Sequence, residues 1–432
     1  MVGIAFATIG TVDPPRVLRR HVAAAVVGNA LEFYDFTTYA YFAVQIGQTF
    51  FPSHSAFVSL MASLATFGVG FVGRPVGAII IGAYGDRVGR KPAMLLSFAL
   101  MGIAITGLAL TPSFAAIGVA APLIVLGMRL LQGFALGGEV GPTTAFLLEA
   151  APRDRRGFYG TLQYASQGMS TLLGGLVGVA LSSALSAQQL QAYGWRVAFL
   201  FGAIILPVGL IIRRSLPETL HASEDAGVGT ADHTAGEHTR TIVLGFAMLA
   251  STTVAFYVLA YLTTYASQTL HMHANVSFAA TAAFGIANIV FSPLAGALSD
   301  RVGRKPVMIW SRALFIVAGV PAFVLLAHNR DVTTLLAVAF GLGALSQSAS
   351  PSIVALTEAL PKAIRSASLA IIYATAISLF GGTTQLAVTG LLHVGGDILT
   401  PAYYLTVANV MGLLAMAMMR ETAPVVVDRK SA

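Results

Sequence analysis

Long runs of apolar residues, separated by short polar turns, follow one another along almost the whole chain. The first set of six runs covers residues 20–48, 56–83, 93–111, 116–148, 158–184 and 195–213. The second set of six covers residues 241–268, 276–298, 306–328, 332–357, 366–392 and 402–419. A helix needs about 20 apolar residues to cross a bilayer. The pattern therefore predicts an all-α membrane protein with twelve transmembrane helices, arranged in two pseudo-symmetric six-helix bundles.

The composition supports a location in lipid for most of the chain. Hydrophobic residues make up 56% of the 432 residues and charged residues only 10%, whereas about a quarter of a soluble globular protein is charged. The chain has no cysteine, which excludes a disulfide framework, a thiolate metal site and an iron–sulfur cluster. No basic segment precedes the first apolar residues, so we expect no removable signal peptide.

Positive charge predicts the orientation of the helices in the membrane. If the N-terminus lies inside the cell, twenty lysines and arginines fall in cytoplasmic segments, and only Arg196 and Arg330 fall on the opposite face. Because basic residues concentrate in cytoplasmic loops, we expect both termini in the cytoplasm. The net charge of +7 then reflects this topology rather than binding to nucleic acid.

A segment rich in Gly, His, Thr and acidic residues separates the two sets of runs. It is too polar to be buried, so we expect a cytoplasmic linker there. The predicted division is an N-terminal six-helix bundle at residues 1–213, the linker at 214–240 and a C-terminal six-helix bundle at 241–432.

Two sequence patterns occur once in each half. The segment GAYGDRVGRK at 82–91 returns as GALSDRVGRK at 296–305. A second spacing is shared by Glu149, Pro152 and Arg156 and by Glu358, Pro361 and Arg365. Two halves of one design, each with six helices in the same orientation, form the parallel repeat of a secondary transporter. In such proteins the substrate site lies between the halves, near the bilayer midplane.

These motifs, together with RLLQG at 129–133, resemble the signatures of the major facilitator superfamily. Within it, the segments GNALEFYDF at 28–36, FFP at 50–52, GRPVGAIIIGAYGDRVGRK at 73–91 and RLLQGFALGGEVG at 129–141 resemble the metabolite–proton symporters. That family includes carriers of citrate, tricarballylate, 2-oxoglutarate, shikimate and proline or betaine, and the first half is most similar to the citrate type. The resemblance implies the major facilitator fold and a proton-coupled symporter that works by alternating access.

The two GxxxDRxGRK segments and the repeated acidic residues are candidates for gating. Their glycines permit a tight turn between helices, the aspartates can pair with a basic partner, and the arginines remain at the anionic lipid interface. Such pairs can hold the cytoplasmic side closed and release it when the bundles rock. The alternative is that the segments only set topology and connect helices. The candidate gating residues are Gly82, Asp86, Arg87, Gly89, Arg90, Glu149, Arg156, Asp300, Arg301, Arg304, Glu358 and Arg365.

Charged residues inside the apolar runs are the candidates for proton coupling. Glu32 and Asp35 lie with two uncharged polar residues within an arc of about 120° on a helix, so the first run has one polar stripe. A charged side chain at the centre of a transmembrane helix costs about 2.5–3.5 kcal/mol. These carboxylates therefore need cationic partners or protons. Arg74 lies at a depth comparable to that of Glu32, and Arg129 lies further outward, where it could meet Asp35.

With Glu139, three acids inside the runs stand against two well-buried arginines, which leaves one carboxylate without a cation. Such a carboxylate favours its protonated form, so it can take up a proton on one side and release it on the other. We expect Asp35 to be the coupling residue, with Glu32 or Glu139 second. The alternative is an inert charge network that fixes helix packing. Arg312, about two turns after Lys305, is expected to extend its side chain to the membrane interface.

Arg129 and Arg74 are the candidate anchors for an anionic substrate, since guanidinium groups form bidentate hydrogen bonds with carboxylates. The Arg74–Pro75 pair belongs to the general pattern of the family, however, and does not select citrate over betaine. Further candidate binding residues are Gln163, Gln167, Tyr257, Tyr261, Asn288, Gln347 and Tyr373. Their alternative roles are helix packing and interhelical hydrogen bonding.

Motifs that suggest other functions fail in this chain. GVGFVG at 68–73 lies inside an apolar run with no preceding strand, so it is not a dinucleotide loop, and the lack of a Gly-Lys dipeptide excludes a P-loop. The nine histidines lie in loops or at the ends of runs, which disfavours a proton relay or metal centre built from them. No convergent nucleophile, base or metal ligands indicate an enzyme, and a transporter-like receptor would usually add a signalling domain.

The sequence therefore predicts a proton-coupled secondary active symporter of small organic acids, citrate-like tri- or dicarboxylates, in the plasma (inner) membrane. We expect no cofactor beyond the proton as coupling ion, no metal and no nucleic acid. The expected partners are the organic acid, the proton and membrane lipid, and the expected working unit is a monomer. The alternative is a proton symporter of zwitterionic solutes such as proline or betaine. An osmosensing betaine carrier is disfavoured because no heptad extension follows Arg420.

Overall fold

Helices are the only regular secondary structure in the described part of the chain. The computed structural model describes residues 19–431 except 138–143, 145, 149, 215–234, 348 and 362–364. The helices of the first half are α1 (Arg19–Tyr41), α2 (Ala43–Phe50), α3 (Ala56–Val88), α4 (Arg90–Leu110), α5 (Phe114–Ile117), α6 (Ala120–Gly137), η1 (Arg153–Arg155), α8 (Arg156–Ala184), α9 (Ala187–Gln189), η2 (Leu190–Gly194) and α10 (Trp195–Arg214). Those of the second half are α11 (Ala235–Ala260), α12 (Leu262–Gln268), α13 (Ala274–Val302), α14 (Arg304–His328), α15 (Val332–Gln347), α16 (Pro351–Ala359), α17 (Arg365–Ala376), η4 (Ile377–Gly381), α18 (Gly382–Gly395), α19 (Thr400–Met418) and α20 (Pro424–Ser431).

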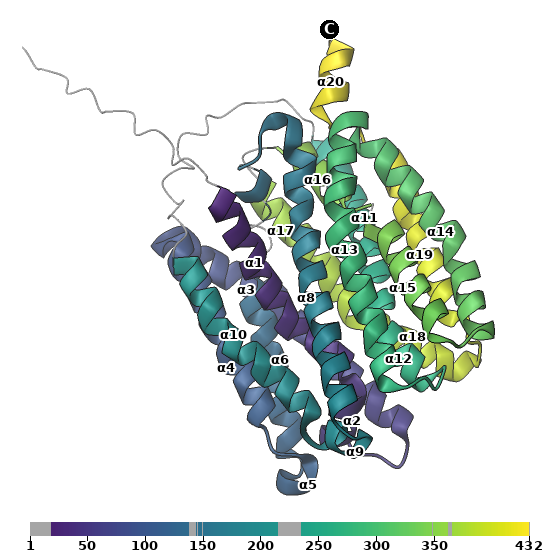
Figure 1. The fold of residues 1–432 in the computed structure, drawn as a ribbon. Helices are drawn as coiled ribbons and strands as arrows, with labels where there is room; N and C mark the ends of the chain where they lie inside the picture. The colour runs from purple at the N-terminus through teal and green to yellow at the C-terminus, as the bar shows by residue number, and fades with distance from the viewer. Residues whose placement is uncertain are drawn as a thin grey trace, which may run out of the picture.

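The long helices, some of them joined end to end, form roughly parallel rods (Figure 1). Among the described residues, nine helices or end-to-end helix pairs are long and apolar enough to cross a membrane, and α1, α8 and α10 run beside them. We call the rods from α1 to α10 the N-terminal bundle and those from α11 to α19 the C-terminal bundle. The prediction of an all-α protein with twelve membrane-spanning helices is confirmed. The domain boundaries at 213 and 240 stay a prediction, because most of the linker lies outside the described residues.

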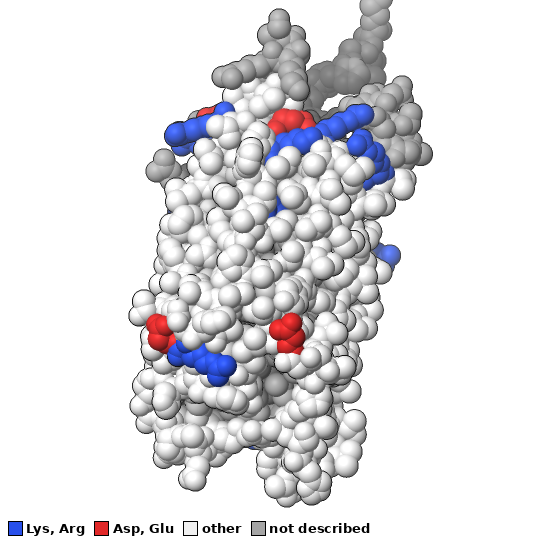
Figure 2. Space-filling model, turned by 90° about the vertical axis from the view of Figure 1, so that its right-hand side faces the viewer, with Lys and Arg blue, Asp and Glu red and all other residues white. Residues whose placement is uncertain are grey.

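Charged side chains gather toward the two ends of the molecule and leave a mostly uncharged band between them on the face shown in Figure 2. The end that carries Asp300, Arg304 and Glu358 is called the charged end below. On two of the long helices, Trp310 and Val317 of α14 and Val407 of α19 are largely exposed. Apolar side chains are exposed in this way where a surface faces lipid, so the band marks the part of the molecule that lies in the membrane.

The GxxxDRxGRK segments are mostly helix rather than loop. The helix α3 continues to Val88 and α13 to Val302, so only Gly89 and Gly303 separate each helix from the next. Both glycines have positive φ, 130° and 109°, a backbone conformation that glycine adopts without strain. A tight turn is thus present at the second glycine of each motif. The expectation that Gly82 belongs to that turn was wrong, because this residue lies inside α3.

Glycines bring α3 and α6 together at backbone distance within the N-terminal bundle. A Cβ at Gly133 would lie 1.5 Å from the carbonyl oxygen of Gly70, and a Cβ at Gly137 would lie 2.0 Å from that of Arg74. Side chains larger than a hydrogen atom do not fit at these two positions, and small residues are common at helix contacts in membranes. This contact places Arg74 of α3 next to Arg129 of α6.

Two sets of helix contacts join the bundles. The first is α8 against α13, which pack from Gly157 and Gly296 near the charged end to Gly178 and Phe278 far from it. The second is α3 against η4 and α18, where a Cβ at Gly68 would lie 2.5 Å from the carbonyl oxygen of Gly382. Polar side chains of the two bundles also meet, as in the hydrogen bond from Gln167 of α8 to Tyr373 of α17.

Candidate functional site

Arg74 and Arg129 are buried together in the N-terminal bundle, with 2% and 0% of their surface exposed. Aromatic rings cover both guanidinium groups. The Cζ atom of Arg129 lies 4.3 Å from the centre of the Phe36 ring and 4.6 Å from that of Tyr39. The Cζ atom of Arg74 lies 4.5 Å from the same Phe36 ring and 4.7 Å from the ring of Phe71. Each such cation–π contact contributes about 0.5–2 kcal/mol, so the rings of α1 and α3 hold both cations in place.

Hydrogen bonds satisfy the donors of Arg129 better than those of Arg74. Nη1 of Arg129 donates to Oε1 of Gln132 at 2.5 Å, and Nη2 donates to the carbonyl oxygen of Phe67 at 3.4 Å. Nε and Nη2 of Arg74 have no hydrogen-bond partner in the described part of the chain. The ion pairs between described residues include neither arginine. A buried cation with unused donors is costly, so this pair is suited to bind an anion.

One of the three predicted coupling acids is described. Glu32 is 2% exposed on α1, as expected for an acid inside the membrane. The side chain of Asp35 and the whole of Glu139 lie outside the described residues. Coupling at Asp35 and its contact with Arg129 therefore stay predictions.

Side chains of the C-terminal bundle face the two arginines. Tyr257 of α11 and Tyr373 of α17 lie within electrostatic range of Arg74. The ring of Tyr257 also lies 5.6 Å from that of Phe71, centre to centre. Gln167 of α8 donates from Nε2 to the hydroxyl of Tyr373 at 3.4 Å, across the bundle boundary. Five of the predicted binding residues, Arg74, Arg129, Gln167, Tyr257 and Tyr373, thus come together where the bundles meet.

Two other predicted binding residues make contacts within one bundle. Gln163 donates from Nε2 to Oδ1 of Asn29 at 3.2 Å inside the N-terminal bundle. Gln347 accepts a hydrogen bond from the hydroxyl of Ser292 at 3.4 Å inside the C-terminal bundle. These contacts are the interhelical hydrogen bonds that the sequence left open as an alternative.

Tyr261 and Asn288 lie apart from the arginines. The hydroxyl of Tyr261 accepts a hydrogen bond from Thr389 at 2.9 Å, beside a cavity of about 420 Å³ that Phe57 and His393 also line. Asn288 of α13 is fully buried against α8, next to Gly168. Its side-chain amide has no hydrogen-bond partner among the described residues, which leaves it available to a ligand or a water molecule.

Arg312 does not reach the membrane interface, and that prediction was wrong. Its side chain is 0% exposed. Nη1 donates to Oδ1 of Asn409 on α19, and Nη2 donates to the hydroxyl of Thr252 on α11 at 3.0 Å. Two neutral polar groups on neighbouring helices hold the guanidinium inside the bundle instead of leaving it to the lipid headgroups. Sequence analysis missed Thr252 and Asn409, although both are polar residues within apolar runs.

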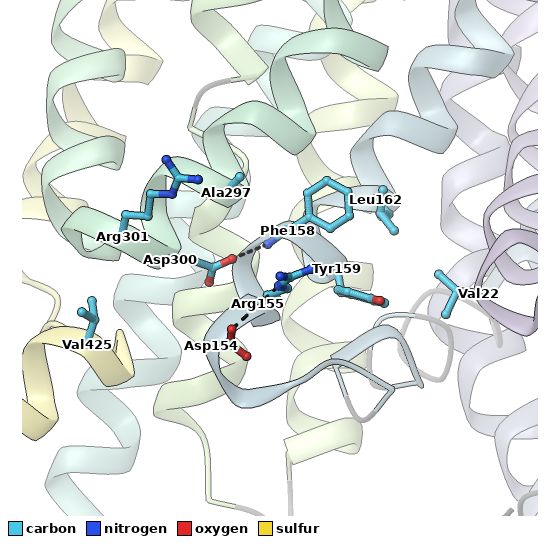
Figure 3. A pocket seen from close by; sticks show the side chains of 10 residues that line it. All are labelled: Val22, Asp154, Arg155, Phe158, Tyr159, Leu162, Ala297, Asp300, Arg301 and Val425. Carbon is cyan, nitrogen blue, oxygen red and sulfur yellow. Dashed lines mark hydrogen bonds and ion pairs between the residues drawn. The ribbon is translucent and has the colours of Figure 1, made fainter. Parts of the chain in front are cut away.

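A network of charges joins the bundles at the charged end. Asp300, at the end of α13, accepts hydrogen bonds from the backbone N–H groups of Gly157 at 2.7 Å and Phe158 at 2.9 Å, in the first turn of α8 (Figure 3). Arg304 donates from Nη1 to Asp300 at 2.6 Å and from Nη2 to Glu358 at 3.1 Å. A carboxylate at a helix N-terminus satisfies free N–H groups and interacts favourably with the helix dipole. Asp300 therefore binds one bundle to the other.

An acid that sequence analysis missed extends this network. Glu421, just after α19, accepts hydrogen bonds from the backbone N–H groups of Arg304 and Lys305, both at 2.9 Å. The hydroxyl of Thr422 donates to Glu358 at 2.8 Å. Glu421 thus covers the N-terminus of α14 in the way that Asp300 covers that of α8. Its place beside Arg420, directly after the last apolar run, was the only indication in the sequence.

The other predicted gating residues of the two halves are only partly described. The side chains of Asp86, Arg90 and Arg365 and the whole of Glu149 lie outside the described residues. Arg87 and Arg301 are exposed, and Arg156 is half-buried. Arg301 borders a cavity of about 910 Å³ that Tyr159 and Asp300 also line (Figure 3). Gating by these residues stays a prediction.

The site can perform two kinds of chemistry with the side chains described. Arg74 and Arg129 can bind an anion where the bundles meet, and Glu32, as a buried carboxylate, can gain and lose a proton. No group of three or more His, Cys, Asp and Glu side chains within the described ranges could hold a metal ion.

Known protein families match both halves of the chain. Residues 21–226 match the model of the family "Sugar (and other) transporter", and residues 242–431 match that of the Major Facilitator Superfamily. The citrate-proton symporter of Klebsiella pneumoniae is 36% identical over 393 residues, which cover 90% of this chain and 88% of that protein. The glycine betaine/proline/ectoine/pipecolic acid transporter of Dickeya dadantii is 33% identical over 438 residues, which cover 97% and 86%. The relatives are transporters rather than enzymes.

A solved structure agrees with the fold. The proton:xylose symporter bound to 6-bromo-6-deoxy-D-glucose has a TM-score of 0.74 at 19% identity, and the match covers 94% of this chain and 96% of that one. At this identity the likeness shows the fold alone. The curated relatives, which include proton symporters, identify a multi-pass membrane protein that carries a small molecule and protons. The chain belongs to the major facilitator superfamily, within its family of metabolite–proton symporters.

Proposed function

We propose that this symporter carries small organic acids, citrate-like tri- or dicarboxylates, together with protons across the plasma membrane by alternating access. The observation that supports the proposal best is the pair of buried arginines, Arg74 and Arg129, which lies beside Tyr257 and Tyr373 of the opposite bundle. Two guanidinium groups in one place suit a ligand with more than one carboxylate, because each can bind a carboxylate through two parallel hydrogen bonds. We also propose that both termini lie in the cytoplasm, because basic residues concentrate in cytoplasmic segments.

A symporter of zwitterions such as proline or betaine is the second candidate. The similarity to the Dickeya dadantii transporter favours it, and aromatic rings such as Phe36, Tyr39 and Phe71 are typical of sites for quaternary ammonium groups. In this protein, however, the guanidinium groups already lie over these rings, at 4.3–4.7 Å. A substrate cation on the same faces would be repelled by two positive charges. The rings therefore serve the arginines, and the site favours an anion.

Protons enter the cycle through the acids of α1. Glu32 is buried in the same bundle as the two arginines, and Asp35 lies one turn further along the same helix. When the carboxylates of the substrate bind to the guanidinium groups, these groups no longer compensate the charge of a neighbouring carboxylate of the protein. That carboxylate then favours its protonated form. Binding of the acid and binding of a proton then promote each other, which is what symport requires.

The network at the charged end controls access from the cytoplasm in this scheme. Asp300 holds the first turn of α8 through Gly157 and Phe158. These contacts cross the bundle boundary, so they must break when the bundles move apart at this end. Release of the substrate into the cytoplasm therefore requires exchange of these hydrogen bonds for water.

Uptake by the purified protein tests the proposal. Proteoliposomes with an imposed pH gradient should accumulate labelled citrate, tricarballylate or 2-oxoglutarate, and a protonophore should abolish the accumulation. Arg330→Gln, which changes an exposed arginine far from the site, serves as the matched control for Arg74→Gln. Accumulation of betaine or proline with no organic acid transported would favour the second candidate. Absence of transport for the whole panel of organic acids would refute the proposal.

A further inference from the structure

Arg312 is a buried cation in the C-terminal bundle that the proposed cycle does not yet use. It lies eight residues after Arg304 on α14, about 12 Å further into the membrane at 1.5 Å per residue. The side chain is 0% exposed, and its Nε has no hydrogen-bond partner in the described part of the chain. Its described partners, Asn409 and Thr252, are neutral. They satisfy two donors but do not balance the charge.

The acidic residues of the C-terminal half lie at other depths. That half contains only six acids, and none of those with described side chains contacts Arg312. They are Asp300, Asp331, Glu358, Asp397, Glu421 and Asp428. Asp300, Glu358 and Glu421 belong to the network at the charged end, as their contacts with Arg304 show. Asp331 and Asp397 lie in exposed loops beyond α14 and α18. Among the described residues of its own bundle, Arg312 therefore has no carboxylate at its depth, and a buried cation without a counter-ion is unfavourable.

A chain of polar groups leads from Arg312 to the site at the bundle boundary. Tyr164 of α8, in the N-terminal bundle, lies within electrostatic range of both Arg312 and Tyr373. Tyr373 in turn lies within electrostatic range of Arg74 and accepts the hydrogen bond from Gln167. The cation of the C-terminal bundle and Arg74 of the N-terminal bundle thus both lie within electrostatic range of one group of tyrosines.

We propose that Arg312 is a second anion-binding residue, which binds a further carboxylate of the substrate from the C-terminal bundle, and that Asn409 and Thr252 position it. This inference rests on the proposed transport of organic acids and narrows it to acids with three carboxylates. Arg74 and Arg129 would each bind one carboxylate and Arg312 the third, so a bound substrate would link the two bundles. An anion of this kind supplies the negative charge that the described residues of its own bundle do not place near Arg312.

The test removes the positive charge of Arg312 and, separately, one carboxylate of the substrate. Binding of tricarballylate and of its mono-amide, which has one carboxylate fewer, is measured on purified protein with and without Arg312→Gln. Loss of the arginine should weaken tricarballylate binding about tenfold or more, as expected for a lost charge-assisted hydrogen bond. It should weaken binding of the mono-amide much less, because the carboxylate that Arg312 binds is then already missing. Non-additivity of this kind reports a direct contact.

Three further variants separate binding from a purely structural role. Arg312→Lys keeps the charge but not the fork of donors, so it should fold and retain part of the preference for tricarballylate. Asn409→Ala should weaken binding of tricarballylate more than of the mono-amide, by less than Arg312→Gln does. Arg330→Gln should change neither. If Arg312→Gln does not fold, the comparison is made with Arg312→Lys and Asn409→Ala.

Two outcomes are distinguishable from each other. In the first, the wild-type protein accumulates tricarballylate, but every Arg312 and Asn409 variant weakens binding of tricarballylate and of the mono-amide by the same factor. Arg312 would then only join α11, α14 and α19, and the inference would be overturned. If the wild-type protein neither binds nor accumulates any organic acid, the proposed function itself fails.

Discussion

Arg304 and Arg74 are both buried arginines, but their surroundings are opposite. Arg304 donates to Asp300 at 2.6 Å and to Glu358 at 3.1 Å, so two carboxylates compensate its charge. Arg74 lies against the rings of Phe36 and Phe71, and two of its nitrogens have no partner among the described residues. At the charged end, carboxylates of the protein thus compensate the buried arginine without a ligand, whereas no described carboxylate does so for Arg74 in the interior. The difference indicates where the protein holds itself together and where it binds.

The strongest test of this comparison is Arg304→Gln. Removing one member of a buried ion-pair network leaves the remaining charges uncompensated and costs about 3–5 kcal/mol. We therefore expect a large fall in the free energy of unfolding, measured by thermal unfolding in detergent. Wild-type thermal stability in this variant would show that the network contributes little.

Arg74→Gln should have the opposite profile. Loss of two charge-assisted hydrogen bonds to the substrate should lower kcat/KM for gradient-driven uptake about 100-fold. Stability without substrate should stay the same or rise, because an uncompensated buried charge is removed. Uptake is measured in proteoliposomes against Arg330→Gln. A variant that transports normally would show that Arg74 is a packing residue.

Asp35→Asn tests whether the interior also contains the proton site. The amide cannot be protonated in the physiological range, so substrate should equilibrate without being concentrated by the pH gradient. Exchange of labelled for unlabelled substrate across the membrane should be affected much less. Equal loss of accumulation and exchange would assign Asp35 a structural role.

Asp300→Asn should loosen the closed end without abolishing the fold. The variant loses the carboxylate that accepts from the first turn of α8, while Arg304 keeps Glu358. Since the chain has no cysteine, Thr161→Cys, at a position that is 0% exposed, provides a unique label. Its reaction with a maleimide should become several-fold faster when Asp300→Asn is added, and should not change with Asp331→Asn. An unchanged labelling rate would show that Asp300 does not keep this end closed.

Glu421→Ala should have the smallest effect. It removes the acceptor of two N–H groups at the start of α14, a loss comparable to that of a helix cap, about 0.5–2 kcal/mol. The thermal unfolding temperature should fall by a few degrees, and uptake should be retained. A loss of uptake at full stability would assign Glu421 to the transport cycle instead.

The membrane architecture was predictable because it depends on local composition. A run of apolar residues must be helical in lipid, whatever it packs against, so the runs beginning at residues 56 and 276 correspond to α3 and α13. The duplicated motif also predicted a tight turn through its glycines, because glycine adopts positive φ without strain, and the turns lie at Gly89 and Gly303. The helical course of the motif up to these glycines was not foreseen, because its charged residues suggested a loop.

The contacts of individual side chains were harder to predict. Arg74 and Arg129 could be expected in the interior because their depth follows from counting residues. The burial of Arg312 could not, because it depends on Thr252 and Asn409, which lie 60 and 97 residues away in the chain. The bonds from Gly157 and Phe158 to Asp300 span more than 140 residues and require the bundles to be docked first.

The contact between Gly68 and Gly382 affects how the bundles can move. Neither residue has a side chain, so the two backbones can slide or roll over each other there without any rotamer having to change. The two backbones lie in close contact there. A methyl group added at Gly68 would lie only 2.5 Å from the carbonyl oxygen of Gly382 and would push the two helices apart. A single added carbon at this point would therefore shift the carrier toward the arrangement in which α3 and α18 are further apart.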